Sequence, residues 1–526
     1  MIHLRDLRIG TRFLRTLPGF LRHPLSPAEA RSIVATAQRG REEALLGMAR
    51  EAIFASHASP YRRLCNAAGC EYGDVEALVR TEGVEGALEA LYRRGVYLTV
   101  DEFKGRRPAK RGSATIDIDP DHLRNPRSVF HVPVRSGGSR SQVSPVLMDL
   151  AFIRDCAART RLMLAARGGE HWVTADWEVP GGGAMFRLLK FAALGAPPQR
   201  WFSHVDPGAP GLHPRYRWSA QAMHVGSRLS GVPLPAPIHA PLDRARVIAE
   251  WLAAIRRDGR VPHLITFPSS AARLCQTAVE ANIDIRGTEL TVSGEPITAA
   301  RLAVIARAGA HALPRYGSIE CGPIAYGCLS PQAPDDVHWI QDMHGLIQSD
   351  GRLGDPLPAG AILITALSPS APFVLFNVSM GDRCTRVSRS CGCPMDGLGW
   401  PVHLRDIRSF EKLTAAGMTF MDTDVIRVLE EVLPAKFGGA PPDYQLVETE
   451  GLDGQPRLLL LVHPRLGLLD EQAIANAFLA AIGTGSGVER MIQHVWRDGD
   501  VVRVERRPPE STTSGKISHL HVSPRR

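Results

Sequence analysis

The sequence contains very little lysine. Only six of the 62 basic residues are lysine, and the arginines are spread along the chain instead of gathering in one stripe. The formal net charge of +8 therefore indicates a biased composition or an anionic small-molecule substrate such as a nucleotide. No nucleic-acid partner is expected, because no basic cluster with interleaved aromatic residues is present.

Long apolar runs and paired cysteines are lacking as well. No stretch approaches the ~20 continuous apolar residues of a membrane-spanning helix, so no transmembrane segment is expected. The first 25 residues alternate Arg with Leu, Ile and Phe, which favours a helix packed on its own domain over a secretion signal, with an amphipathic surface anchor as the alternative. Nine cysteines, an odd number, argue against a disulfide framework and predict a reducing, cytoplasmic location.

The pattern of apolar residues predicts an α/β protein of several units. A chain of 526 residues exceeds one simple core. Residues 1–130 are mostly helical in pattern, and capping boxes at Ser26 and Thr99 predict two helix starts. Residues 131–420 alternate strands with helices, which predicts βαβ units and a parallel sheet. Residues 421–526 follow the order α, β, β, α, β, as in a small α+β domain.

Four motifs follow one another in the central segment. The stretch "VRSGGSRSQVSP" (134–145) offers glycine N–H groups, hydroxyls and arginine to a polyphosphate, with a flexible loop as the alternative. "VSGEP" (292–296) is a strand-to-helix turn. "RYGSIECG" (315–322) is expected to be a loop leaving a strand end, where open α/β sheets bind ligands. "MGD" (380–382) is expected to close a strand at 373–382 with a carboxylate suited to ribose hydroxyls.

In this order the motifs resemble those of the adenylate-forming superfamily of acyl-CoA synthetases, with the phenylacetate–CoA ligases and the acyl-protein synthetases of bacterial bioluminescence as the nearest branch. "RYGSIECG" resembles the Tyr-Gly-x-Thr-Glu core, "SGGSRSQ" the phosphate loop and "MGD" the Thr-Gly-Asp motif. "IRSFEKLTAAGMTF" (407–420) is similar to the hinge, and "TTSGKISHL" (512–520) to the C-terminal Gly-Lys motif. The resemblance implies a large adenylate-forming domain and a small mobile C-terminal domain after about residue 420.

The resemblance also implies roles for individual residues. Tyr316 would stack on adenine, Glu320 would bind the Mg²⁺ on the phosphates, and Asp382 would hold the ribose hydroxyls with Arg408 nearby. Lys516 would bridge the substrate carboxylate and the α-phosphate, because a flexible cation can bring two anions together. The remaining nucleotide-binding residues implied are Ser136, Gly137, Ser139, Gly294, Glu295, Gly317 and Ser318.

The sequence departs from the family pattern in two places. In the phosphate loop, Gly138 and Arg140 stand where the first threonine and the second glycine would be. In the hinge, Ile407 replaces glycine and Glu411 replaces the second aspartate. These departures argue against fast rotation of the C-terminal domain, and so against the CoA step that the rotation serves. They are compatible with adenylation.

The expected activity is therefore that of an ATP-dependent, AMP-forming acid–thiol ligase. A small carboxylic acid would react with MgATP to give an acyl-adenylate, and the acyl group would pass to a thiol, CoA in the first instance. A carrier protein, an amine or another nucleophile is the alternative acceptor. An inactive fold that acts as a binding or scaffold protein is the second alternative. Three glycines at 181–183 fall where the family builds its acyl pocket, although a plain helix start also explains them.

A set of cysteines and a histidine suggests a metal. Cys328 and His338 precede the Cys-x-Cys pair Cys391 and Cys393, and three thiolates with one imidazole suit a tetrahedral structural Zn²⁺. Some phenylacetate-type ligases resemble this pattern. Buried free thiols are the alternative interpretation. Alternative ligands in the same segment are Cys321 and Cys384.

Overall fold

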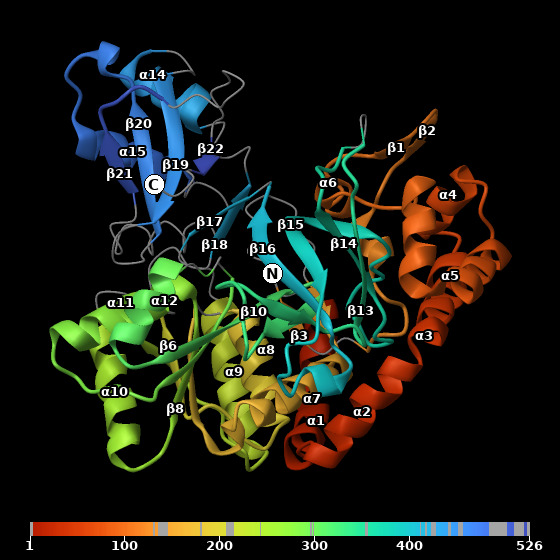
Figure 1. Ribbon diagram of the computed structural model, residues 1–526, viewed down its shortest axis with the longest axis horizontal. Coiled ribbons are helices and arrows are strands. Elements are labelled where there is room, and N and C mark those ends of the chain that lie inside the picture. The colour runs from red at the N-terminus through yellow and green to blue at the C-terminus, as the bar shows by residue number, and fades with distance from the viewer. Residues whose placement is uncertain are drawn as a thin grey trace.

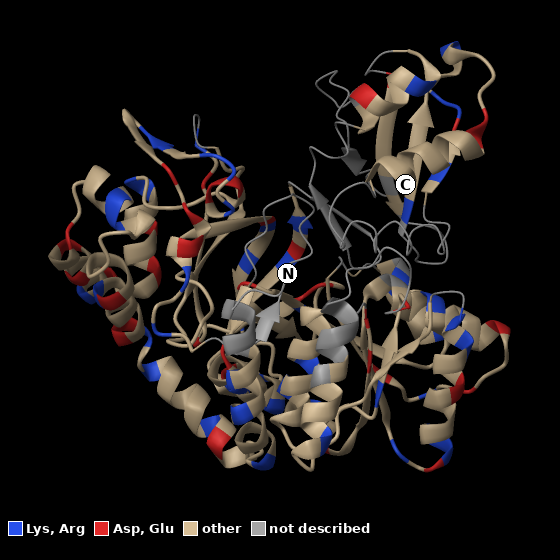
Figure 2. Cartoon of the chain, turned by 180° about the vertical axis from the view of Figure 1, so that it is seen from behind, with Lys and Arg blue, Asp and Glu red and all other residues tan. Residues whose placement is uncertain are grey.

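The computed structural model shows a broad mixed sheet flanked by helices and a smaller C-terminal sheet (Figure 1). The structure describes residues 4–129, 132–134, 146–178, 181–206, 215–241, 244–294, 297, 299–352, 356–410, 412–415, 418–421, 428–439, 443–450, 456–482, 502–509 and 520–522. Among these residues no helix is both long and apolar enough to cross a bilayer. Lys and Arg are spread over the described helices of the whole molecule (Figure 2).

The N-terminal region consists mainly of helices. The capping boxes predicted at Ser26 and Thr99 are confirmed, since each side chain accepts from the N–H three residues on and the glutamate there accepts from the cap. Two short strands, β1 (Ala109–Arg111) and β2 (Ala114–Ile116), pair antiparallel after the helices. The helices are α1 (Leu4–Arg22), α2 (Pro27–Arg39), α3 (Arg41–Met48), the π-helix η1 (Ala49–Phe54), α4 (Pro60–Ala67), α5 (Tyr72–Arg93), α6 (Val100–Phe103) and the short η2 (Pro120–Leu123).

One half of the twelve-stranded sheet is parallel, as the strand–helix alternation predicted. Its strands run in the order β7-β6-β5-β8-β9-β10, and all neighbours are parallel. Their bounds are β5 (Val173–Trp177), β6 (Arg200–Ser203), β7 (Pro237–His239), β8 (Pro262–Thr266), β9 (Glu289–Val292) and β10 (His311–Ser318). The helices between and before them are α7 (Leu150–Ala166), α8 (Gly182–Ala192), α9 (Arg215–Leu229), α10 (Ala245–Arg257), α11 (Pro268–Glu280) and α12 (Ala299–Arg307).

The other half is antiparallel and continues in the order β10-β11-β12-β16-β15-β14-β13. The strand predicted over 373–382 has other bounds in the structure. It begins only at Val378, as β15, and continues to Ser388. Asn377 causes the late start: it has a φ of 51°, and its buried amide donates to the carbonyls of Leu88 and Val96. "MGD" therefore lies inside β15. The strands are β11 (Gly322–Gly327), β12 (Val337–Trp339), β13 (His344–Gln348), β14 (Ala361–Ala366), β15 (Val378–Ser388) and β16 (Val402–Ser409).

The C-terminal region has a hydrophobic core of its own. Buried residues of its helices and strands, among them Leu429, Leu446, Leu460 and Phe478, form one cluster. Figure 1 shows its sheet (blue), ordered β21-β20-β19-β22, beside the large sheet and not within it. Its division from the large domain and its mobility stay predictions. The elements of this region are η6 (Val428–Val432), α14 (Leu433–Phe437), β19 (Tyr444–Glu450), β20 (Pro456–Val462), α15 (Glu471–Ile482), β21 (Val502–Glu505) and β22 (Leu520–Val522). A hairpin of β17 (Lys412–Ala415) and β18 (Met418–Met421) precedes them in the chain. A further antiparallel pair, β3 (Val132–Val134) and β4 (Val146–Met148), precedes α7.

A buried ion pair joins α7 to the antiparallel half of the sheet. Arg159, 2% exposed, donates to one oxygen of Asp342 from Nε at 2.7 Å and from Nη2 at 2.6 Å, and Trp400 donates to the other oxygen at 2.8 Å. We expect Asp342→Ala to lower the free energy of unfolding by about 3–5 kcal/mol, because it removes the buried partner of the guanidinium and leaves only the longer contact of Nη1 with Asp155 at 3.3 Å. Urea unfolding followed by tryptophan fluorescence measures this.

The matched control is Arg246→Ala. Arg246 pairs with Glu250 on the surface of α10, where both side chains are more than half exposed, so the loss should stay within about 1 kcal/mol. Similar losses in the two variants would contradict the importance assigned to the buried pair.

Candidate active site and metal cluster

The β10–β11 hairpin forms the centre of the candidate site. A turn does leave the strand end as predicted, but it is shorter than 315–322, because residues 315–318 continue β10 and only 319–321 turn before β11. Tyr316 pairs with Ala325 across the hairpin, and a bulge follows it. A Cβ on Gly317 would collide with the carbonyl oxygen of Gly322, so only glycine permits this approach. The hairpin thus fixes Tyr316 at the point where the parallel and antiparallel halves meet.

Tyr316 and Asp382 lie together. The Tyr316 hydroxyl on β10 donates to Asp382 Oδ2 on β15 at 2.9 Å, although 66 residues separate them in sequence. Burial, and next the nearby Asp382 charge, raise the pKa of Tyr316 well above its usual value, so the phenol stays a hydrogen-bond donor. Next to Asp382, Gly381 has a φ of 89°, and its carbonyl accepts from Phe410 N and Ser409 Oγ. The predicted ribose carboxylate is therefore held beside the predicted adenine platform.

Glu320 lies in the hairpin turn and is 5% exposed. Its Oε1 forms an ion pair with Lys104, which follows α6 in the N-terminal region. The turn is tightened by Ser318, whose hydroxyl accepts from Cys321 N at 3.2 Å. Sequence reasoning missed Lys104, although a chain with only six lysines gives each of them weight. The carboxylate predicted to bind Mg²⁺ thus already has a cation beside it.

Arg408 lies on β16 next to Ser409, and Ser409 pairs with Asp382 on β15. Its Nη1 donates to Asp335 Oδ2 at 2.9 Å. Asp335 also accepts from the backbone N–H groups of Asp406 and Ile407 at 3.1 and 3.0 Å. Asp335, which sequence reasoning also missed, therefore fixes the residues that begin the predicted hinge.

The other predicted nucleotide-binding residues divide into two groups. Gly294 lies two residues after β9 with a φ of 90°, at the carboxyl edge of the parallel strands where Tyr316 lies. The remainder lie outside the described residues: Ser136, Gly137, Gly138, Ser139, Arg140, Glu295, Glu411 and Lys516. Val134 and Val146, which flank the phosphate loop, are paired in the β3–β4 ladder.

The predicted metal ligands come together around His338, which lies on β12. His338 Nε2 lies 3.5 Å from Cys391 Sγ and 3.2 Å from Cys393 Sγ. A zinc ion at about 2.0 Å from nitrogen and 2.3 Å from sulfur holds such atoms about 3.5 Å apart in a tetrahedron. Cys328 and Cys391 join His338 in one group whose ligand atoms all lie within 4.8 Å, and Cys393 joins His338 and Cys391 in a second. Among the described residues, neither Cys321 nor Cys384 belongs to these groups.

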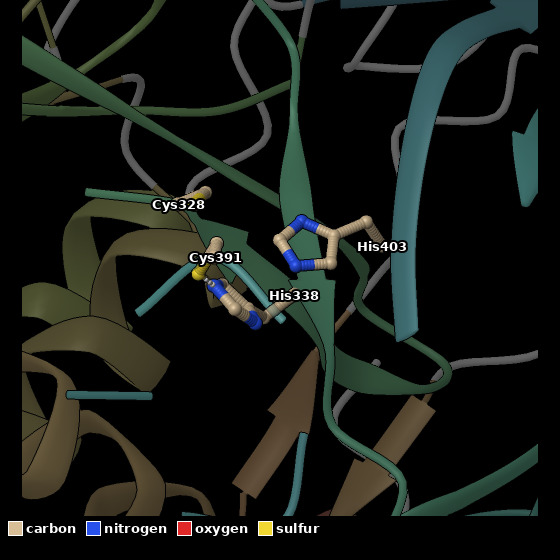
Figure 3. A group of neighbouring side chains, drawn as sticks. All are labelled: Cys328, His338, Cys391 and His403. Atoms are coloured by element: carbon tan, nitrogen blue, oxygen red, sulfur yellow. Dashed lines mark hydrogen bonds between the residues drawn. The ribbon is translucent and has the colours of Figure 1, made fainter. Parts of the chain in front are cut away.

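The structure adds His403 to the cluster (Figure 3). His403 pairs with His338 across β12 and β16, and their ring centroids are 4.1 Å apart. Its Nδ1 donates to Asp336 Oδ1 at 2.6 Å, while its buried Nε2 has no partner among the described residues. His338 is oriented in the same way, since its Nδ1 donates to the Trp400 carbonyl at 2.7 Å. Both imidazoles thus present Nε2 to the thiols, as zinc-binding histidines with hydrogen-bonded Nδ1 atoms do.

Burial governs the protonation of the thiols. It raises the pKa of Cys391 and of Cys328 above the usual thiol value. It also lowers the pKa of His338, so the imidazole is neutral at pH 7. Neutral imidazole is the form that binds a metal, and a bound cation would convert the thiols to thiolates. The donor set therefore fits a closed structural zinc site.

A cavity of about 560 Å³ lies elsewhere, at the amino ends of β5 and β8. Trp172, Gln199 and Arg260 are among its lining residues. It lies at the opposite edge of the sheet from Tyr316, and it contains none of the predicted site residues.

The Lys104–Glu320 pair can be tested without assuming any activity. We expect Lys104→Met to destabilise the wild type more than it destabilises a Glu320→Gln background. The difference should be about 1–3 kcal/mol, since removing Lys104 leaves a buried carboxylate without a counter-ion. Urea unfolding of the two single variants and the double variant gives the coupling energy. Lys110→Met, at an exposed site on β1, is the control and should show no coupling.

No protein-family model and no curated protein sequence matches the chain. Among solved structures, that of 2-hydroxyisobutyryl-CoA ligase in complex with 2-HIB-AMP and CoA in the thioesterification state is similar, with a TM-score of 0.56 and 18% identity over 95% of this chain and 91% of that one. The same ligase in the postadenylation state has a TM-score of 0.48 at 17% identity, covering 95% of this chain and 91% of that one. A point mutant of the amide bond synthetase Mcba from Marinactinospora thermotolerans has a TM-score of 0.39 at 14% identity, covering 91% and 92%. The first of these likenesses shows that the chain shares the fold of that acyl-CoA ligase.

Proposed function

We propose that the protein activates a carboxylic acid with ATP to an acyl-adenylate and transfers the acyl group to a thiol, that of CoA. One observation carries the proposal: Tyr316, at the carboxyl edge of the parallel strands, is hydrogen-bonded to Asp382, and Glu320 lies in the turn of the same hairpin, in a chain with the fold of an acyl-CoA ligase. Ligands of open α/β sheets bind at this edge.

The first step joins the acid to the nucleotide. A carboxylate oxygen attacks the α-phosphorus of ATP, the bond to the bridging oxygen breaks, and acyl-adenylate and pyrophosphate form. In the second step a thiolate sulfur, whose proton has gone to solvent, attacks the acyl carbon, and AMP leaves. Positioning and charge neutralisation account for most of the catalysis in such reactions.

The described residues supply binding and neutralisation. Tyr316 stacks on adenine, and Asp382 accepts from the ribose hydroxyls. Glu320 would hold Mg²⁺ through its carboxylate oxygens, the kind of ligand that Mg²⁺ prefers, and the ion would neutralise negative charge on the phosphates. Lys104, whose ammonium pairs with Glu320, would supply a further positive charge to the site. Lys516 bridges the carboxylate and the α-phosphate from the C-terminal domain.

The choice of acceptor depends on the hinge. The similar ligase structure holds CoA, which supports CoA for this chain. An amine or a carrier protein is the alternative, since Ile407 replaces the hinge glycine and Asp335 binds its backbone N–H. Release of AMP that requires CoA separates the two, whereas release with an amine alone would favour the alternative.

We expect ATP–pyrophosphate exchange to require one class of acid in a panel of aryl and aliphatic acids. Lys516→Ala should reduce the exchange by roughly 10²-fold or more, as the loss of a transition-state cation does. Asp382→Ala should raise the KM for ATP, because a ribose contact is lost. Lys436→Ala, an exposed lysine of α14, is the control. Exchange unaffected by Lys516→Ala would refute its role, and failure to bind ATP at all would favour the inactive scaffold.

We further propose that the cluster of Cys328, His338 and Cys391 binds one structural Zn²⁺, with Cys393 or His403 as the fourth ligand. Four protein ligands leave no open position, so such an ion stabilises the strands and takes no part in the reaction. The orphaned Nε2 of His403 supports this.

Zinc content decides the proposal. The purified protein should contain one equivalent of zinc by elemental analysis, and Cys391→Ala should lose it. Cys275→Ala, a buried thiol of α11 outside the cluster, should keep it. Of Cys393→Ala and His403→Ala, the one that lowers the zinc affinity by roughly 10²-fold identifies the fourth ligand. A protein that contains no zinc and gains no stability from added zinc would refute the site.

A further inference from the structure

Lys190 on α8 is a buried lysine without a counter-ion. The residue is 2% exposed. Within the described part of the chain, no hydrogen bond or ion pair to its ammonium is found. Its closest aromatic neighbours are Phe186 and Phe191, whose ring centroids lie 5.9 and 5.6 Å from Nζ. Burial lowers the pKa of Lys190 well below the usual value. Fully buried lysines are rare unless they are paired, so this one calls for an explanation.

Arg315 adds a second cation to the same place. It directly precedes Tyr316 on β10, and it pairs with Tyr326 across the hairpin. Tyr326 in turn bonds Thr160 of α7 at 2.7 Å, so Arg315 belongs to the face of the sheet that α7 covers. The Nε of Arg315 is buried and has no partner among the described residues. The positive charge of Arg315 is the strongest charged influence on Lys190, and it further lowers the pKa of that lysine.

The carboxylates near Lys190 and Arg315 are already paired. Asp176 on β5 is fully buried, and both of its oxygens accept from Arg187 Nε, at 3.1 and 3.4 Å. Arg187 also forms the ion pair with Glu178, just after β5. Cys156 of α7 is also near Lys190, and burial raises its thiol pKa to about 12, which leaves it neutral. His263 of β8 is near Lys190 as well, and burial lowers its pKa well below the usual value, so its imidazole is neutral too. Among the residues that the structure describes, Arg187 therefore has its anions, while Lys190 and Arg315 have none.

The ammonium form of Lys190 is costly here, because it loses hydration, has no anion beside it and lies near the positive charge of the half-buried Arg315. A fold that only needed to fill this space would place apolar side chains there. A ligand that brings an anion would remove the cost when it binds. The arrangement is therefore that of a preformed site for a negatively charged group.

The positions of Lys190 and Arg315 indicate which part of the bound molecules would carry the anionic group. Asp176 and Arg315 lie at the carboxyl ends of β5 and β10, the edge where Tyr316 lies. α8 begins at Gly182, just beyond the carboxyl end of β5, and side chains of a helix tilt toward its N-terminus. Lys190 lies in the last turn of α8, and its stem runs from there toward the same edge. Arg315 lies next to the predicted adenine platform but on the other face of the strand, so its anion is not the nucleotide.

We infer that Lys190 and Arg315 bind a second carboxylate on the acid substrate, so that the substrate class is the dicarboxylic acids. The inference rests on the proposed function for the identity of the reaction, but binding of the diacid does not require it. One carboxylate lies at the reaction centre and the other between Lys190 and Arg315. A monocarboxylic acid of the same skeleton leaves both cations without an anion and binds more weakly.

The test compares acids in matched pairs: terephthalate with para-toluate, and adipate with hexanoate. Binding is measured by thermal shift and equilibrium dialysis, with and without MgATP, and exchange of pyrophosphate is measured in parallel. The variants are Lys190→Met, which keeps the length of the stem, and Lys436→Met as the exposed control. We expect one diacid to bind the wild type and Lys436→Met, and its partner monoacid to bind much more weakly. Lys190→Met should weaken the diacid roughly thirtyfold or more and leave the monoacid unchanged.

Stability provides a second readout that a purely structural lysine would not give. Without ligand, Lys190→Met should melt at the same temperature as the wild type or higher, because it removes a buried amine whose charged form has no anion beside it. Lys190→Arg should keep a preference for the diacid over its monoacid.

The outcomes separate this inference from the proposed function. Exchange with a monoacid but with no diacid would leave the proposed function intact and overturn the inference. A diacid that binds through Lys190 without supporting exchange would support the inference and refute the proposed reaction. Absence of binding by either diacid under both conditions, equal binding of diacid and monoacid, or unchanged binding in Lys190→Met would each overturn the inference.

Discussion

The close approach of two backbone segments at the centre of the sheet underlies the whole candidate site. Gly317 lies so near the Gly322 carbonyl that a single added carbon would collide with it. This contact closes the β10–β11 hairpin where the sheet changes from parallel to antiparallel. It puts Glu320 into a buried turn, Tyr316 against Asp382 and Arg315 on the opposite face. One steric constraint thus determines where three functional side chains lie.

The buried charged side chains are of two kinds, those with a counter-ion and those without one. Arg159 with Asp342 and Lys104 with Glu320 are complete pairs, and they connect α7 and the N-terminal helices to the sheet. Such pairs specify which segments meet, because a misplaced partner leaves an ion without compensation. Within the described residues, Lys190 and its neighbour Arg315 lack that compensation, and they do so at the edge where ligands of α/β sheets bind. The paired charges stabilise the fold, whereas the unpaired ones suggest that a ligand supplies the missing anion.

The metal cluster and the hinge are connected through two adjacent carboxylates. Asp336 holds His403 and Arg389 beside the thiols, while Asp335 holds Arg408 and the backbone of Ile407. An ion that fixes β12 against β16 would therefore also fix the segment that leads into the C-terminal domain. In the proposed reaction such an ion would have a structural role and no chemical one, since four protein ligands would leave it no open position.

Local features could be predicted from the residues alone: two capping boxes, the strand–helix alternation of the parallel half, and the motifs that contain Tyr316, Glu320 and Asp382. These depend on spacing within a few residues, which a single chain shows directly. The sequence did not reveal that β15 begins at Val378, that Lys104 meets Glu320, or that His403 faces His338. Each of these depends on partners between 65 and 289 residues away along the chain. Only tertiary packing brings such residues together, because the cost of closing long loops is met by the burial of the sheet as a whole.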